Sequence, residues 1–189
     1  MESKILFRWL LFAIAITLLH FFLFPTSALS FFVPDPSTFV IWSIASVGFT
    51  LLTSGIFHAV FGTKDVEASL PFLLGISSLE EGVFRQAAVI AIKYVLPLLV
   101  AGSADLFVTV AIIAVMQAFI FAVVHRHVHV SGFFLSIGWL IVAWYGGMIP
   151  AAIGHIVANT MVKILGAASD AEELEIVHGL KLYNFGPFF

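Results

Sequence analysis

The chain consists of long apolar runs separated by short polar clusters. Charged residues gather at positions 2–8, 64–67 and 170–175, and the runs between them carry few charges. About 20 apolar residues in a helix, at about 1.5 Å each, cross the ~30 Å hydrocarbon core of a bilayer. The pattern therefore predicts an all-α fold, a polytopic membrane helix bundle with about six transmembrane helices. The predicted spans are residues 5–24, 38–61, 70–100 with a break near Pro97, 105–125, 132–148 and 150–165.

Helix-breaking residues mark the connections between these runs, and no internal repeat or low-complexity tract divides the chain. We therefore predict a single membrane domain over residues 1–189, ending in a short polar tail at residues 167–189. In this tail Ser169 and Glu172 have the spacing of a capping box, which predicts a short surface helix through Lys181. The predicted linkers contain Pro25, Pro34 and Pro36, then Gly62, then Gly102, then Gly146, Gly147 and Pro150.

Composition narrows the class of protein further. Charged residues make up 10% of the chain and hydrophobic residues 61%, whereas soluble domains carry about 25% charged residues, so a water-soluble fold is excluded. The net charge of −3 argues against nucleic acid as a partner. The absence of cysteine excludes disulfides, thiolate metal sites and a cysteine nucleophile.

The amino-terminal run has two interpretations. Lys4 and Arg8, the apolar run and then residues 26–28 also fit a cleavable signal peptide, but 20 apolar residues are long enough to cross, which favours an uncleaved span. With a cytoplasmic amino terminus and six spans, most basic residues fall on the cytoplasmic side and Lys93 does not. Both termini are therefore predicted to be cytoplasmic. The basic residues on that side are Lys4, Arg8, Lys64, Arg126, Lys163 and Lys181.

Ionisable side chains inside the predicted spans are the strongest functional signal, because each costs several kcal/mol in hydrocarbon. Glu81 and Arg85 are four residues apart and share a helix face, so they can neutralise each other. Glu80 projects about 100° away and is expected to face a different cavity, where a carboxylate suits general-base work on water.

A second set of polar residues lies in the last spans. His155 and Asn159 are four residues apart and form a potential donor pair for an oxyanion. Gly154 and Ala158 allow another helix to approach closely. His125 ends the fourth span, where it would orient and help deprotonate water held by Glu80. A water-activating pair and an oxyanion donor pair are the groups that acyl transfer to water requires.

The three motifs resemble those of the type II CAAX prenyl endopeptidase family, also called CAAX protease and bacteriocin-processing (CPBP) proteins or the Abi family. The family pattern is EExxxR, FxxxH and HxxxN, in that order and embedded in the membrane. It appears here as Glu80, Glu81 and Arg85, then Phe121 and His125, then His155 and Asn159.

The resemblance implies an intramembrane glutamate endopeptidase with its catalytic core at residues 70–165 and its site inside the bundle. Glu80 and His125 would activate water, His155 and Asn159 would stabilise the oxyanion, and Glu81 with Arg85 would hold the motif helix. We expect a membrane-associated peptide or protein as substrate, in the plasma (inner) membrane of a prokaryote. Gln86 replaces a glycine common in the family and Val123 a smaller residue, which leaves the subfamily and the substrate open.

Other interpretations of the same residues stay open. Glu80, Glu81 and Arg85 also fit a structural salt-bridge cluster, and His155 with Asn159 fits interhelical hydrogen bonding. No cofactor is expected, although a divalent metal such as zinc, held by Glu80, His125 and His155, is an alternative. His125 and His129 share a helix face, but Arg126 favours an interfacial role for His127 and His129. His20 and His58 are expected to be packed histidines, with a haem site as a remote alternative.

The competing functional hypothesis is a non-catalytic membrane protein. Buried carboxylates and histidines also suit a proton-coupled carrier, or an inactive relative that serves as a scaffold or immunity factor. The motifs favour the peptidase, because they contain both a water-activating group and oxyanion donors.

Overall fold

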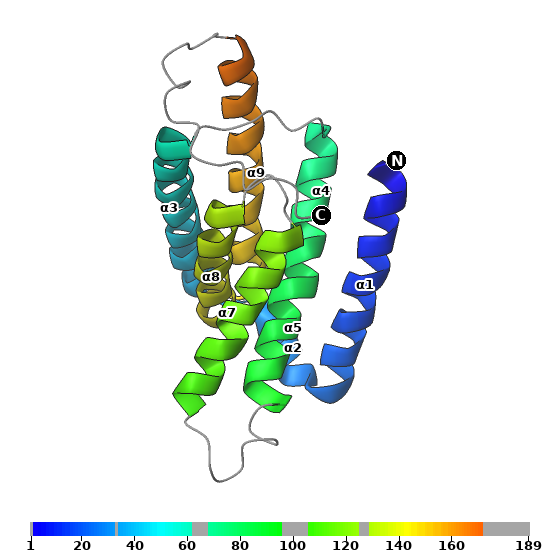
Figure 1. Ribbon diagram of the computed structural model, residues 1–189. Helices are drawn as coiled ribbons and strands as arrows, with labels where there is room; N and C mark the ends of the chain where they lie inside the picture. Colours follow the sequence, from blue (N-terminus) through cyan, green and yellow to red (C-terminus); the bar gives the residue numbers. More distant parts are fainter. Residues whose placement is uncertain (1, 33, 62–67, 96–105, 125–128, 172–189) are drawn as a thin grey trace.

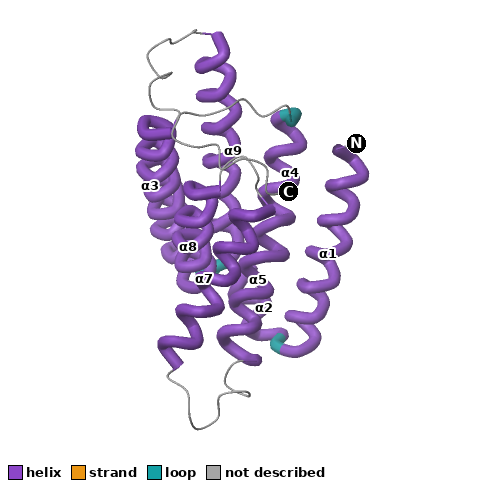
Figure 2. Tube along the Cα trace, in the orientation of Figure 1, coloured by secondary structure: helices purple, strands orange, loops and turns teal. Residues whose placement is uncertain are grey.

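The computed structural model describes residues 2–32, 34–61, 68–95, 106–124 and 129–171, and its regular structure in these residues is entirely helical (Figure 2). The all-α class is therefore confirmed for the described part of the chain. The elements are α1 (Glu2–Leu23), α2 (Pro25–Phe32), α3 (Pro36–Phe61), α4 (Leu70–Glu80), η1 (Glu81–Arg85), α5 (Gln86–Ile90), η2 (Ala91–Val95), α7 (Leu106–Val124), α8 (His129–Gly146) and α9 (Met148–Ala171).

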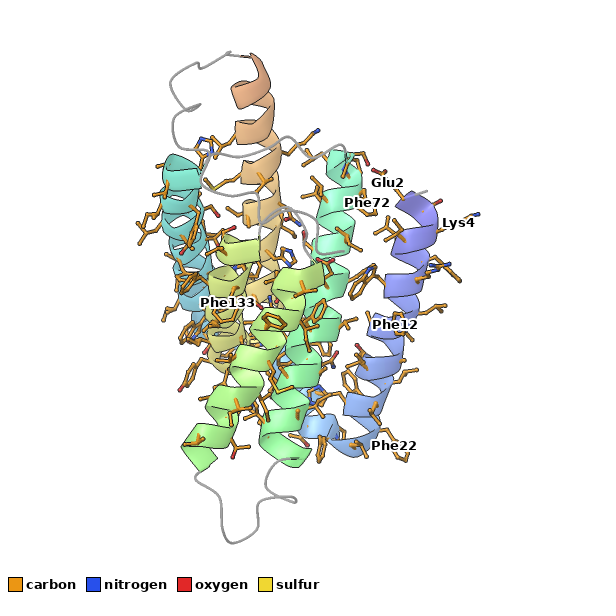
Figure 3. The ribbon with its side chains drawn as sticks, in the orientation of Figure 1. Glu2, Lys4, Phe12, Phe22, Phe72 and Phe133 are labelled. Atoms are coloured by element: carbon orange, nitrogen blue, oxygen red, sulfur yellow. The ribbon has the colours of Figure 1, made fainter. Side chains whose placement is uncertain are left out.

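Within the described residues, three helices are long and apolar enough to cross a membrane. These segments are Glu2–Leu23, Pro36–Val60 and Met148–Leu165 in α1, α3 and α9. Shorter apolar segments, Val108–Val123 and Val130–Gly146, form most of α7 and α8. Large side chains such as Phe12 and Phe22 on α1 are exposed, Phe22 at 85% (Figure 3). An apolar exterior of this kind suits lipid, and the three candidate spans indicate a membrane protein.

Successive long helices run in alternating directions along the bundle (Figure 1). The central helix is α9, which packs against α3, α4, η1 and α8. The start of α1 and the end of α9 lie at the same end of the bundle, the upper end in Figure 1. At that end the Glu2 carboxylate accepts hydrogen bonds from the backbone N–H (2.9 Å) and the hydroxyl (2.7 Å) of Ser69, which caps α4.

The prolines assigned to the first linker have a different role from the one predicted. Pro25 begins α2 and Pro36 begins α3, so a short helix occupies a stretch that was expected to be irregular. Proline suits the first helical position because its fixed φ is already helical and the missing N–H has no partner there. Between α8 and α9, Gly147 turns the chain with a φ of 86°. A Cβ at Gly147 would lie 2.6 Å from the carbonyl oxygen of Phe31, so only glycine fits.

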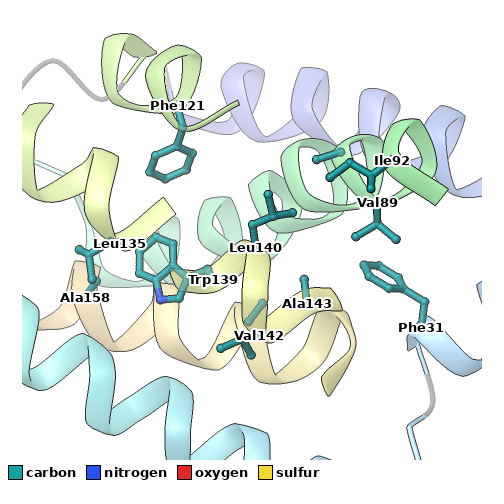
Figure 4. Close-up of a cluster of buried hydrophobic side chains, with 12 residues drawn as sticks. Phe31, Val89, Ile92, Phe121, Leu135, Trp139, Leu140, Val142, Ala143 and Ala158 are labelled. Atoms are coloured by element: carbon teal, nitrogen blue, oxygen red, sulfur yellow. The ribbon is translucent and has the colours of Figure 1, made fainter. Parts of the chain in front are cut away.

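The buried apolar core joins α2, α5, η2, α7, α8 and α9 (Figure 4). Phe121, Leu135, Trp139 and Ala158 form one part of it, and the other part includes Phe31, Val89, Ile92 and Ala143. Phe121 and Trp139 of the first part contact the polar cluster described below.

Close helix contact around α9 occurs at Gly154, as the small-residue pair predicted. A Cβ at this position would lie 2.2 Å from the Ser46 hydroxyl of α3 and 2.7 Å from the Trp139 ring nitrogen of α8. The glycine therefore admits two neighbouring helices, α3 and α8.

The carboxyl-terminal part of α9 also differs from expectation. Ser169 lies inside α9, which continues to Ala171, so this serine does not cap a new helix. Glu172 and Lys181, like Pro97, lie outside the described residues.

Candidate active site

Four ionisable side chains from two adjacent helices meet inside the bundle. Glu80 ends α4, Glu81 and Arg85 are the first and last residues of the π-helical turn η1, and His155 lies in α9. Glu80 is 5% exposed, His155 is 1% exposed, and Glu81 and Arg85 are fully buried. In η1 the backbone N–H of Gln86 donates to the Glu81 carbonyl five residues earlier. Such turns occur frequently at functional sites.

His155 lies between the two carboxylates. Its Nδ1 is 3.0 Å from Glu81 Oε1, and its Nε2 is 3.5 Å from Glu80 Oε2. Glu80 and Glu81 were expected to face different cavities. This expectation is wrong, because both carboxylates contact the same imidazole. Because the ring of His155 lies between the diverging side chains, one carboxylate meets each ring nitrogen.

Arg85 lies beside the carboxylate pair. Its Nε is 3.2 Å from Glu81 Oε2, which is the i,i+4 ion pair that the spacing predicted. Its guanidinium carbon lies 4.6 Å from the ring centre of Phe121 and 5.6 Å from that of Trp139. Within the described part of the chain, neither terminal guanidinium nitrogen has a hydrogen-bond partner. Arg85 thus neutralises Glu81 and retains donor capacity.

Two aromatic rings, those of Trp139 and Phe121, pack against the imidazole of His155. Trp139 stacks on His155 with ring centroids 4.5 Å apart and an interplanar angle of 20°. Phe121 meets the same imidazole edge-to-face at 5.3 Å. The indole N–H of Trp139 donates to the Thr50 hydroxyl of α3 at 3.0 Å, which fixes the stacking ring. Side chains from five structural elements, α3, α4, η1, α7 and α8, therefore position one imidazole of α9.

Asn159 lies one helical turn beyond His155 and faces the same neighbour, α4. Its amide nitrogen donates to the Ser77 hydroxyl at 2.8 Å, and that hydroxyl donates to the Leu73 carbonyl at 2.6 Å. Ser77 precedes Glu80 by three residues, so the amide lies close along α4 to the carboxylates. His155 and Asn159 therefore both face α4, as their four-residue spacing predicted.

His125 lies outside the described residues, as does His127, and His129 begins α8. Of the three ligands in the metal alternative, Glu80 and His155 are in contact, and the contribution of His125 stays a prediction. The described residues contain no group of three or more histidine or acidic side chains arranged to hold a metal.

Several contributors could not be anticipated from the motifs. Ser77, Thr50 and Trp139 belong to none of the three motifs. Gln86 is fully buried, and its amide contacts Nδ1 of the packed His20 at 2.9 Å. The Thr17 hydroxyl donates to the other end of this amide at 3.1 Å. The polar amide of Gln86 directly after the motif arginine was the one sequence signal for these contacts. A buried amide needs hydrogen-bond partners, which here are His20 and Thr17.

The cluster places a carboxylate oxygen beside each ring nitrogen of His155. A neutral imidazole has one N–H and one acceptor nitrogen, yet both ring nitrogens of His155 face carboxylate oxygens. One further proton, on His155 or on a glutamate, removes this conflict. It also balances two carboxylates against one guanidinium. Proton exchange between His155 and a carboxylate is what general acid–base chemistry needs.

Comparison of the chain with protein-family models, with curated proteins and with solved structures gave no match.

Proposed function

We propose that the protein is an intramembrane endopeptidase that hydrolyses a peptide bond in a membrane-associated substrate at the Glu80–Glu81–Arg85–His155 cluster. The contact between Glu80 Oε2 and His155 Nε2 carries the proposal. It joins a carboxylate and an imidazole from different helices in a buried interior. Ionisable groups are costly there, so their presence in contact indicates a functional site.

In the proposed reaction Glu80 takes a proton from water while the oxygen attacks the carbonyl carbon. The carbonyl oxygen then becomes an oxyanion, which His155 and Asn159 stabilise by donating N–H groups. Collapse of this intermediate breaks the C–N bond, and the proton held by Glu80 passes to the leaving amine. The products are a carboxylic acid and an amine, so one water molecule is consumed and Glu80 is returned to its ionised form.

The supporting side chains have separate tasks in this proposal. Glu81 binds Nδ1 of His155 and directs Nε2 toward the reacting groups. Arg85 neutralises the negative charge of Glu81, so His155 does not have to neutralise both carboxylates. The resemblance of the motifs to the CPBP family adds His125 as a second group that orients the water.

We further propose that six segments cross the membrane: α1, α3, the continuous run from α4 to η2, α7, α8 and α9. The alternating direction of these segments supports this topology (Figure 1). By the positive-inside rule, Lys4 and Arg8 at the start of α1 place that end in the cytoplasm. The cluster would then act on peptides anchored in the plasma (inner) membrane.

The test is digestion of membrane-tethered peptides by the purified protein in liposomes, with products identified by mass. Suitable peptides carry a lipid anchor, a leader sequence or a carboxyl-terminal hydrophobic tail. We expect wild type to produce two fragments whose masses sum to substrate plus one water, and His155→Gln to be at least 100-fold slower. The control is His58→Gln in α3, which should cut at the wild-type rate.

A chelator arm decides the metal question in the same assay. Unchanged cleavage after treatment with a chelator supports direct activation of water by Glu80. Loss of cleavage that zinc restores would support the alternative with Glu80, His125 and His155 as ligands. If no peptide is cut by any form of the protein, the carrier or scaffold hypothesis replaces the peptidase.

A further inference from the structure

A second polar site lies apart from the cluster. A cavity of about 420 Å³ is bordered by α1, α2, the start of α3, η2 and the α8–α9 turn. Its polar and aromatic lining includes His20, Asp35, Thr38, Lys93, Trp144 and Tyr145. None of the four cluster residues lines it. Its volume is in the range of small-molecule sites.

The cavity lies at the level where membrane spans end. Asp35 immediately precedes the span that starts at Pro36, and His20 is within one turn of the end of the α1 span at Leu23. Gly147 separates the apolar segments of α8 and α9. Lipid headgroups occupy this level of a bilayer.

Lys93 supplies the positive charge of the cavity. Its ammonium lies 4.8 Å from the centre of the Trp144 ring, a cation–π distance, and no carboxylate among the described residues forms an ion pair with it. Lys93 is also the basic residue that the positive-inside rule leaves on the wrong side. An anionic ligand in the cavity accounts for both observations.

Asp35 supplies a negative charge to the same cavity. One carboxylate oxygen, Oδ1, accepts hydrogen bonds from the Ser37 hydroxyl (2.6 Å) and the Thr38 backbone N–H (3.0 Å). Hydrogen bonds from the Ser37 side chain, the Thr38 side chain and the Thr38 backbone N–H hold the pKa of Asp35 well below its ordinary value, so the group is ionised at neutral pH. Carboxylates accept about four hydrogen bonds, so Oδ2 can receive an ammonium donor.

We propose that this cavity binds a membrane lipid whose headgroup is a phosphate ester with a primary ammonium group, as in phosphatidylethanolamine. Lys93 binds the phosphate, and Asp35 binds the ammonium. Trp144 and Tyr145 border the headgroup, as aromatic residues do at membrane interfaces. A water-soluble phosphoethanolamine has the same charges, but the location at the span ends favours the lipid.

The test is native mass spectrometry of the full-length, delipidated protein, titrated with short-chain phosphatidylethanolamine or phosphatidylglycerol. We expect wild type to bind phosphatidylethanolamine about tenfold more tightly than phosphatidylglycerol, because only the former has an ammonium for Asp35. Asp35→Asn keeps a helix-capping side chain and should lose this preference. Lys93→Gln should weaken both lipids about tenfold, whereas Lys93→Arg should retain binding. Lys4→Gln, at the other end of the bundle, is the matched control and should bind as wild type does.

Equal binding of both lipids by wild type would overturn the proposal, as would wild-type affinity of Asp35→Asn or Lys93→Gln for phosphatidylethanolamine. Soluble phosphoethanolamine should displace the lipid only at about 100-fold higher concentration or above, because it lacks acyl chains. Displacement at equal concentration would overturn the assignment of the site to a lipid.

Discussion

Trp139 and His155 are stacked almost in parallel, with ring centroids 4.5 Å apart and an interplanar angle of 20°. This contact fixes the plane of the imidazole, and the carboxylates of Glu80 and Glu81 fix its edges. The histidine therefore has a defined orientation before any substrate binds. Such preorganisation lowers the cost of stabilising a charge that develops during a reaction.

The stacked indole depends on its hydrogen bond to Thr50. We expect Trp139→Phe to keep most of the stacking but to destabilise the protein by about 1 kcal/mol, the usual contribution of such a bond. Thr50→Val should cost a similar amount, and the double variant should cost little more than either single one. Thermal unfolding in detergent measures all three. Strictly additive losses would show that the hydrogen bond between these residues contributes nothing.

Arg85 compensates a fully buried carboxylate. Arg85→Met should destabilise the protein by about 3–5 kcal/mol, because Glu81 loses the guanidinium that neutralises it. Adding Glu81→Gln should recover most of this loss, since the charge that required compensation is gone. Denaturant unfolding of the single and double variants tests the expectation. A double variant as unstable as Arg85→Met would mean that Arg85 acts through packing on Phe121 and Trp139 instead.

Gly154 provides the close approach of α9 to α3 and α8. Gly154→Ala should destabilise the bundle by about 1–3 kcal/mol, because a Cβ there would lie 2.7 Å from the Trp139 ring nitrogen. It should also slow cleavage, since the displaced indole is the platform for His155. Gly48→Ala in α3 is the matched control, because its Cβ would meet nothing within 4 Å. Equal stability of the two variants would show that α9 can shift without cost.

Asp35 caps the start of α3 outside the membrane span. Its hydrogen bonds from Ser37 and Thr38 lower its pKa in the folded state. A lowered folded-state pKa adds stability above the unfolded-state pKa of about 4, and this stability is lost as the pH falls through the folded-state value. Asp35→Ala should therefore unfold at a lower temperature than wild type at pH 7, and the difference should shrink below about pH 4. A difference that stays the same at pH 7 and pH 3 would contradict this account.

The positions of the long helices could be predicted from the sequence, because the length of an apolar run decides whether a helix can cross a bilayer. The runs at residues 5–24 and 38–61 correspond closely to α1 (Glu2–Leu23) and α3 (Pro36–Phe61). The helix α2 was missed because prolines were interpreted as breakers, although proline is also favoured at the first helical position.

The site was predictable in its parts and less so in its arrangement. Spacing predicted the Glu81–Arg85 pair, because i,i+4 partners depend only on local helix geometry. Contacts between helices, such as Asn159 with Ser77 or Trp139 with Thr50, depend on tertiary packing and have no local signal. For the same reason, His155 could not be placed between Glu80 and Glu81 from their positions in the chain.

The most direct test of the peptidase is the rate at which Glu80→Gln cuts a tethered peptide that wild type cuts. This substitution keeps the size of the side chain and removes the group that accepts the proton from water. The account predicts a rate at least 100-fold below wild type, with the variant folded as judged by its thermal unfolding. Cleavage by Glu80→Gln at the wild-type rate would contradict it.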